Sequence, residues 1–446
     1  MSQLFENRRL EFMRSTKIKV VLGLALALLA AGTMLVFVLA SQLAPSPSTP
    51  PGTALAQSAG TVQPSSTSLR LPTRTPQTTA ESSDVMSTVV PTASAQSLTP
   101  QPTSQTSTPQ AMSEVRQPYI GIWISAAELA NLPTSGPAWE HLSSEAAREL
   151  REPRIRNQNE ANNIYLLAKA LVYARTGESG YREEIIDNLM AAIGSEDGGR
   201  TLSLGRNLLA YVLAADLVNL PADPDKDRVF RQWLRETLTE ELDGLTLQST
   251  QELRPNNWGT HAGASRVAVA LYLQDDAELE RAAQVFKGWL GDRDAYAEFS
   301  YGDLYWQADP DSPVGINPLG ATKEGHSIDG AQPEEMRRGG KFRWPPKRTN
   351  YPWGALQGAL VQAEMLCRVG YPTWEWEDRA LLRAVEFLYE IDWPPEGDDE
   401  WQPWLINYAY DTDYPAPLTT RPGKNMGWTD WTHSEFRPPR GQQGGC

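Results

Sequence analysis

Apolar residues recur at helical spacing through most of the chain after Tyr119, whereas strand-like alternation is rare. Residues three and four apart share one face of an α-helix, and glycine is a common helix stop. The pattern predicts an all-α domain built of amphipathic helices. The stripes that carry it are Ile164, Leu167 and Leu171 before Gly177; Leu204, Leu208, Tyr211 and Ala215; Val267, Leu271 and Tyr272; Leu356, Leu360, Ala363 and Cys367; and Leu381, Val385, Leu388 and Ile391.

Short loops between these stripes favour antiparallel helical hairpins. Hairpins set around an axis form an incomplete (α/α) toroid with a cleft at one end, and we expect this fold for residues 115–436. An α-solenoid is the alternative, but no repeat of fixed period is found. Residues 296–353 and 392–446 lack a helical period and are expected to be irregular, the first as an ordered loop over the cleft.

The amino-terminal region has the pattern of a membrane anchor. Residues 20–40 form an uncharged apolar run that begins at Val20 and ends at Ala40, long enough to cross a bilayer of about 30 Å. Cations precede this run and none follows it until Arg70, so the amino end is expected in the cytoplasm. We expect a cytoplasmic tail at 1–19, an uncleaved signal anchor at 20–40 and an extracellular catalytic part; a cleaved signal peptide is the alternative, with a shorter apolar core.

The next segment, residues 41–114, consists mainly of Ser, Thr, Pro, Ala and Gln. Such a composition buries too little apolar surface to offset chain entropy, so we expect a disordered stalk kept extended by its prolines. The last residues, 437–446, are expected to be a flexible tail.

The net charge of -15 argues against nucleic acid as a partner, because a field of this sign repels polyanions. An anionic ligand would need a local basic patch. The loop offers one in an acid-free run interrupted by Phe342 and Trp344, although a solvated loop is the alternative. Arginine presents a planar fork that fits a carboxylate. The cations of this run are Arg337, Arg338, Lys341, Arg343, Lys347 and Arg348.

Cysteine and histidine usage predicts neither a metal site nor a cofactor. The two cysteines, Cys367 and Cys446, cannot form a disulfide framework, and we expect Cys367 to be a buried thiol. The four histidines are scattered along the chain and lack zinc-site spacing.

Two segments carry the candidate chemistry. The first runs from Arg254 to His261, and places Asn257 and His261 four residues apart, on one side of a helix amino end where the dipole favours an anion. The alternative is that Asn256 or Asn257 only caps this helix and that His261 is a satisfied internal histidine.

The second segment runs from Asp329-Gly330-Ala331 through Glu335-Met336-Arg337-Arg338-Gly339 and on to Tyr351. With the first it supplies amide, imidazole, guanidinium and phenol groups. That set can remove a proton beside a carboxylate without metal or cofactor, because donors neutralise the carboxylate charge.

The two segments together resemble the alginate lyase superfamily, most closely its family 38 glucuronan and mannuronan lyases, and Gly205-Arg206-Asn207 through Asp216 is similar to an early inner helix of that family. The resemblance implies β-elimination of a uronic-acid glycan. It implies that Asn257 and Arg338 neutralise the substrate carboxylate, that His261 assists or acts as base, and that Tyr351 exchanges a proton with C5 or the leaving oxygen. Further substrate contacts are expected from Arg206, Asn207, Trp258, His326, Glu335, Lys341 and Trp344.

The chain departs from the family pattern in two places. Trp258 stands where the family has histidine, and Tyr351 follows Arg338 at a longer interval than usual, so His326 or Tyr301 is the alternative for these roles. Two other classes remain open. An inverting glycosidase would use Asp329 with Glu335, and a surface glycan-binding protein would use none of them catalytically. The expected partners are an acidic polysaccharide and the membrane, with the chain monomeric.

Overall fold

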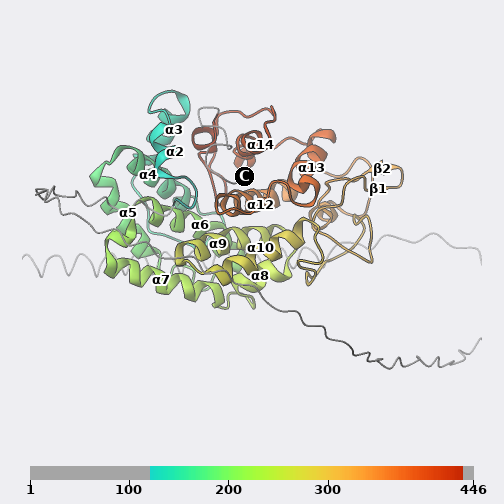
Figure 1. The fold of residues 1–446 in the computed structure, drawn as a ribbon, viewed down its shortest axis with the longest axis horizontal. Helices are drawn as coiled ribbons and strands as arrows, with labels where there is room; N and C mark the ends of the chain where they lie inside the picture. Colours follow the sequence, from blue (N-terminus) through green and yellow to red (C-terminus); the bar gives the residue numbers. More distant parts are fainter. Residues whose placement is uncertain (1–120, 435–446) are drawn as a thin grey trace, which may run out of the picture. The chain divides into compact units, whose positions relative to one another are not determined.

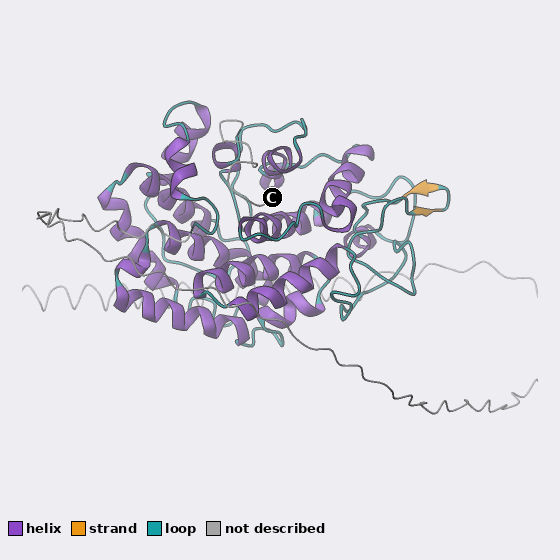
Figure 2. Ribbon diagram, in the orientation of Figure 1, coloured by secondary structure: helices purple, strands orange, loops and turns teal. Residues whose placement is uncertain are grey.

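The computed structural model describes residues 121–434, so the predicted anchor, stalk and tail lie outside the described residues. Nearly all the regular structure of the described part is helical, which confirms the all-α prediction (Figure 1, Figure 2). Its two short strands, β1 (Thr322–Lys323) and β2 (His326–Ser327), form one antiparallel hairpin.

Most helices follow one another with short connections; the longer connections are residues 147–161, 291–350 and 411–428. In chain order they are α2 (Ala126–Asn131), α3 (Pro137–Ala146), α4 (Asn162–Thr176), α5 (Ser179–Ala192), α6 (Thr201–Leu217), η1 (Leu220–Ala222), α7 (Pro224–Thr239), α8 (Leu247–Leu253), α9 (Asn257–Leu273), α10 (Asp276–Leu290), α11 (Pro333–Met336), η2 (Arg337–Gly339), α12 (Tyr351–Arg368), α13 (Trp376–Glu390), η3 (Gly397–Asp399), α14 (Gln402–Tyr410) and α15 (Thr429–Thr432).

Four of these helices make a contiguous inner row. Helix α4 packs on α6, α6 on α9, and α9 on α12, while α5, α7, α8, α10 and α13 pack outside or between them. Figure 1 shows α9 among α6, α8, α10 and α12, all of which contact it. Helices of the inner row are separated in the chain by outer ones, α5 between α4 and α6, α7 and α8 between α6 and α9, and α10 between α9 and α12. Closure of the row into an incomplete (α/α) toroid stays a prediction.

The predicted apolar stripes lie in helices α4, α6, α9, α12 and α13, and nearly all their members are buried. Gly177 ends α4 in the left-handed region, at φ 76°, as the sequence predicted. Leu271 and Ile391 are the exceptions, because both are only half-buried near a helix end.

Two glycines bring three helices of the inner row close together at one point. A Cβ at Gly205 of α6 would lie 2.7 Å from the backbone N of Ala262, and a Cβ at Gly358 of α12 would lie 2.4 Å from the carbonyl carbon of Thr260. Only glycine permits backbones to approach so closely. Helices α6 and α12 therefore meet α9 on either side of His261.

The two stretches predicted to be irregular differ in outcome. Residues 296–350 form an ordered loop that contains the β-hairpin, α11 and η2. The prediction for residues 392–446 is wrong where the chain is described, because it contains η3, α14 and α15. Helix α14 is short and has Pro403 in its first turn, where proline needs no amide partner. Nine residues are too few to show a clear helical period, so the sequence pattern missed this helix. Packing on α12 stabilises it.

Cys367 lies on the buried face of α12, as predicted, but it is disulfide-bonded, so the expected thiol is wrong. The chain's other cysteine, Cys446, lies outside the described residues. No helix between residues 121 and 434 combines the length and apolarity needed to span a bilayer.

Candidate functional site

A cleft of about 600 Å³ opens beside the amino end of α12. Arg348, Thr349 and Asn350, at the end of the long loop, form one side together with Trp353 of α12. The opposite side comes from the carboxy-terminal region, with the lining residues Trp393, Pro394, Glu396, Gly397, Asp398, Asp399, Glu400, Thr420 and Arg421. The cleft is thus built by segments that the sequence separates widely.

The first motif forms the amino end of α9, and its two asparagines differ in role. Asn256 is the cap, because its side-chain oxygen accepts a hydrogen bond from the backbone N–H of Trp258 at 3.0 Å. Asn257 is buried one residue later, and its Oδ1 has no hydrogen-bond partner among the described residues. Buried amide oxygens normally accept a hydrogen bond, so Oδ1 of Asn257 is left for a donor group of a ligand.

Glu335 of α11 joins the second motif to the first. Its Oε1 accepts a hydrogen bond from the backbone N–H of Asn257, and its Oε2 has no partner in the described part. Burial raises the pKa of Glu335 to about 8, against the lowering effects of the Asn257 N–H and the nearby Arg338. This carboxyl can therefore be protonated near neutral pH.

Arg338 lies over the ring of Tyr351, the first residue of α12, with Cζ 4.2 Å from the ring centroid. Its guanidinium has no ion pair within residues 121–434, and its side chain is exposed. By contrast, Arg337 is bound to the buried Glu334, with Nε 2.8 Å from Oε2. Of the two adjacent arginines, Arg338 alone is free to meet an external carboxylate.

His261 is completely buried, and neither ring nitrogen has a hydrogen-bond partner among the described residues. The alternative of a satisfied internal histidine is therefore wrong. Burial lowers its pKa well below the usual value, and the cations Arg206 and Lys424 lower it further. The ring is neutral at pH 7, so it can form hydrogen bonds with a ligand but does not supply positive charge.

Arg206 of α6 interacts electrostatically both with His261 and with the carboxyl groups of Glu335, Asp398 and Asp399. Its Nε has no partner in the described structure, and burial lowers its pKa while Asp398, Asp399 and Glu335 raise it. The structure thus brings Arg206 electrostatically close to both Glu335 and the acidic side of the cleft.

Asn207, the neighbour of Arg206, has a structural function instead. Its Nδ2 donates to the carbonyl oxygens of Ile155 at 2.8 Å and Asn157 at 2.9 Å, which fastens the loop before α4 to α6. Trp258 is half-buried beneath another arginine, with Cζ of Arg254 5.2 Å from the ring centroid.

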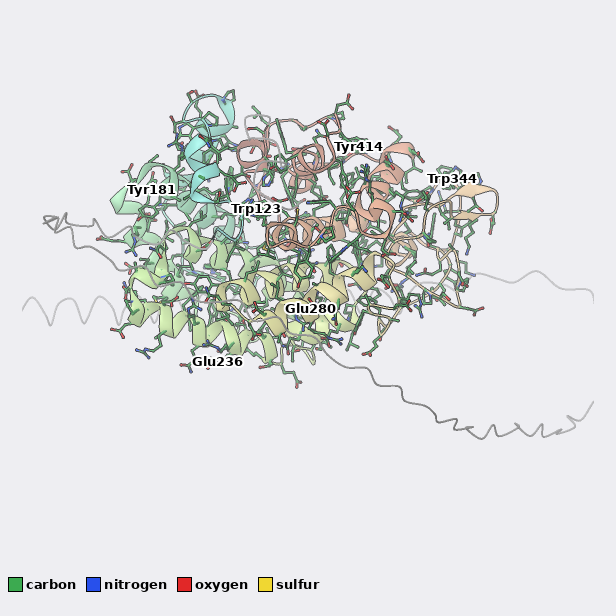
Figure 3. The ribbon with its side chains drawn as sticks, viewed as in Figure 1. Trp123, Tyr181, Glu236, Glu280, Trp344 and Tyr414 are labelled. Atoms are coloured by element: carbon green, nitrogen blue, oxygen red, sulfur yellow. The ribbon has the colours of Figure 1, made fainter. Side chains whose placement is uncertain are left out.

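The other predicted substrate contacts lie along the long loop. Trp344 stacks on His326, with centroids 4.6 Å apart and planes 10° apart, and Figure 3 shows Trp344 beside the β1–β2 hairpin. Lys341 lies 5.5 Å from the ring centroid of Tyr305. None of these residues lines the cleft.

Tyr301, the alternative tyrosine, has a buried hydroxyl with no partner among the described residues, and burial raises its pKa. Its ring packs edge-on against Phe299 at 6.1 Å. A buried phenol with a raised pKa ionises poorly, which argues against Tyr301 as the base.

Asp329, the acid proposed for a glycosidase, is committed to structure. Its Oδ1 accepts from Nη1 of Arg383 at 2.6 Å, and its Oδ2 accepts from the N–H of Gly320 at 2.8 Å. The next residue, Gly330, has φ 73°, and a Cβ there would lie 2.0 Å from the Arg383 carbonyl oxygen. Asp329 therefore holds a turn in place, and the pairing of Asp329 with Glu335 is not supported.

Sequence reasoning missed two buried polar residues at the cleft, Gln357 and Asp399. Gln357 of α12 donates to Oδ1 of Asp399 at 2.7 Å and accepts from the N–H of Lys424 at 2.8 Å. The available signal was a glutamine among the apolar residues in the first half of α12. Within residues 121–434, no group of three or more His, Cys, Asp or Glu side chains is placed to hold a metal ion.

We compared the sequence with models of known protein families. Residues 155–295 match the family model described as alginate lyase, a segment that contains Arg206, Asn257 and His261. The match confirms the resemblance to the alginate lyase superfamily over this segment. Arg338 and Tyr351 lie beyond the matched segment. No curated protein and no solved structure matches the chain.

Proposed function

We propose that this protein is a polysaccharide lyase that cleaves a uronic-acid glycan of the alginate, polymannuronate or glucuronan type by β-elimination. We propose that it is closest to the family 38 lyases, because its two motifs resemble theirs most. The observation that carries the proposal is the position of the Arg338 guanidinium over the ring of Tyr351. Arg338 follows Glu335 by three residues, and the carboxyl of Glu335 accepts a hydrogen bond from the backbone N–H of Asn257. A carboxylate binder and a phenol are thereby adjacent.

In the proposed reaction, Arg338 and the amide of Asn257 bind the substrate carboxylate and stabilise the charge that develops when C5 loses its proton. Tyr351 takes the C5 proton or protonates the leaving oxygen. The neutral ring of His261 assists by hydrogen bonding rather than by charge, because its pKa is lowered. Arg206 supplies a second cation.

The first test measures ultraviolet absorbance of the full-length protein with polyglucuronate, polymannuronate, polyguluronate and hyaluronan. Elimination leaves a conjugated double bond, whereas hydrolysis does not. An increase with one polymer supports the lyase and identifies its substrate. New reducing ends without an increase would point to a glycosidase, and binding without any product would point to a glycan-binding protein.

A second test replaces Tyr351 with phenylalanine. Loss of the phenol should lower kcat by about 100-fold or more with little change in binding, because proton transfer contributes on that scale. Tyr305→Phe is the control, since Tyr305 is an exposed tyrosine of the loop before α12, and its ring contacts Lys341 rather than Arg338. Unchanged turnover in Tyr351→Phe would contradict the assigned role.

We also propose that the protein is a monomer anchored in the cell membrane by residues 20–40, with its catalytic part outside. The support is the apolar run and the cations before it. Protease added to intact cells should remove the catalytic part and leave the amino end protected. Protection of both parts would contradict this orientation.

A further inference from the structure

Asp399 brings a carboxyl group into the cleft that none of the motifs includes. It is the last residue of η3, it lines the cleft, and its side chain is 7% exposed. Thr349 and Asn350, the two residues before Tyr351, line the same cleft. Tyr351 itself is not among the residues that line this cleft, but a glycan that extends from Tyr351 past Thr349 and Asn350 would enter the cavity that Asp399 reaches.

Two glutamines hold this carboxyl in place. Its Oδ1 accepts from Nε2 of Gln357 at 2.7 Å and from Nε2 of Gln402 at 3.0 Å. Gln402 also donates to the carbonyl oxygen of Trp353 at 3.2 Å, so α12 and α14 both support the arrangement. Within residues 121–434, every hydrogen bond to this carboxyl ends on Oδ1, which leaves Oδ2 for a group in the cleft.

The surroundings also favour a carboxyl that exchanges its proton near neutral pH. The pKa of Asp399 is raised to about 7, mainly by burial and in smaller part by the neighbouring charge of Asp398. Hydrogen bonding by Gln357 and the charges of Lys424 and Arg206 act in the opposite direction. Lys424 is partly neutralised, because its Nζ lies 3.0 Å from Oδ2 of Asp398.

We propose that Asp399 is a further catalytic residue of the cleft, the acid that protonates the leaving glycosidic oxygen. The inference rests on the proposed lyase function and leaves Tyr351 as the base. Tyr351 takes the C5 proton, and the electrons of the C5–H bond form the C4=C5 double bond. The C4–O4 bond breaks with its electron pair on O4, which receives the proton of Asp399. Water then returns a proton to Asp399 and takes one from Tyr351.

The test compares two substrates that differ only in the group that leaves from C4. One is a uronate oligomer, whose sugar alkoxide needs a proton, and the other carries 4-nitrophenol at O4, which leaves as a stable anion. In full-length Asp399→Asn, kcat/KM for the oligomer should fall by about 100-fold or more, whereas kcat/KM for the nitrophenyl substrate should change little.

The matched control is Asp430→Asn. Asp430 is also a buried carboxyl with a raised pKa, about 6, but it does not line the cleft. This variant should keep the wild-type ratio between the two substrates. Equal losses on both substrates in Asp399→Asn would overturn the assignment of Asp399 alone. Failure of the wild-type protein to form a double bond from either substrate would overturn the proposed function as well.

A measurement on the wild-type protein keeps the proposal testable if Asp399→Asn does not fold. Because the acid must be protonated, kcat/KM for the oligomer should fall as the pH rises above about 7, while the nitrophenyl substrate should show no such fall. Identical pH profiles for the two substrates would overturn the inference.

Discussion

Replacing Arg338 with alanine should separate catalysis from folding. The side chain is exposed and has no ion pair within residues 121–434, so its main contact is with the Tyr351 ring, 4.2 Å from Cζ to the centroid. A cation above an aromatic ring at an exposed site contributes about 0.5–1 kcal/mol. The free energy of unfolding should therefore fall by no more than about 1 kcal/mol.

The effect on catalysis should be larger. Loss of one donor that stabilises developing negative charge costs about 2.7–4 kcal/mol, or about 100–1000-fold in kcat. We expect a loss of kcat in this range for Arg338→Ala, because among the described residues no second exposed arginine lies over Tyr351 to replace the lost donor. Initial rates by ultraviolet absorbance and unfolding by denaturant titration measure the two quantities on the same protein.

Two arginines of the same loop serve as controls. Arg343 is exposed and donates only to the Pro345 carbonyl, at 3.3 Å, so Arg343→Ala should change neither quantity much. Arg337→Ala should destabilise the fold by about 1–3 kcal/mol, because it removes a donor from the buried carboxylate of Glu334. If Arg338→Ala lost stability in proportion to activity, or kept full turnover, the reasoning would be refuted.

Three other substitutions test neighbouring parts of the site. Asn256→Ala removes a helix cap and should lower the free energy of unfolding by about 0.5–2 kcal/mol with little loss of turnover, whereas Asn257→Ala should show the reverse; equal behaviour in rate and denaturation assays would contradict the division. The pKa of Glu335 is raised from 4.5 to about 8, so the folded state holds this proton more tightly than the unfolded chain. The contribution of Glu335 to the free energy of unfolding is complete below pH 4.5 and is lost as the pH rises to about 8, by up to about 1.4 kcal/mol per pH unit. Glu335→Gln should remove this pH dependence of the free energy of unfolding in denaturant titrations. An unchanged pH dependence would argue against a buried, protonated Glu335. Gly330→Ala should reduce the melting temperature, because its φ is 73° and its Cβ would collide with the Arg383 carbonyl; an unchanged melting temperature would show that the turn can relax.

The amino-acid sequence by itself determined the helical class and the residues of the two motifs. Helical periodicity is local, because each turn places residues three and four apart on one face whatever lies opposite. For the same reason the start of α9 was predictable from Asn256, Asn257 and the apolar residues that follow. The basic run, with Arg338 within it, is likewise visible in the chain alone.

Only the tertiary structure decided how each polar side chain is used. Asn256 caps a helix while Asn257 keeps an unpaired oxygen, and Asp329 is bound to Arg383 although it stands in a motif. Asp399 reaches the cleft because α14 and the residues around it pack on α12, far from it in sequence. Burial, pairing and pKa depend on groups brought together from distant segments, and sequence spacing carries no record of those contacts.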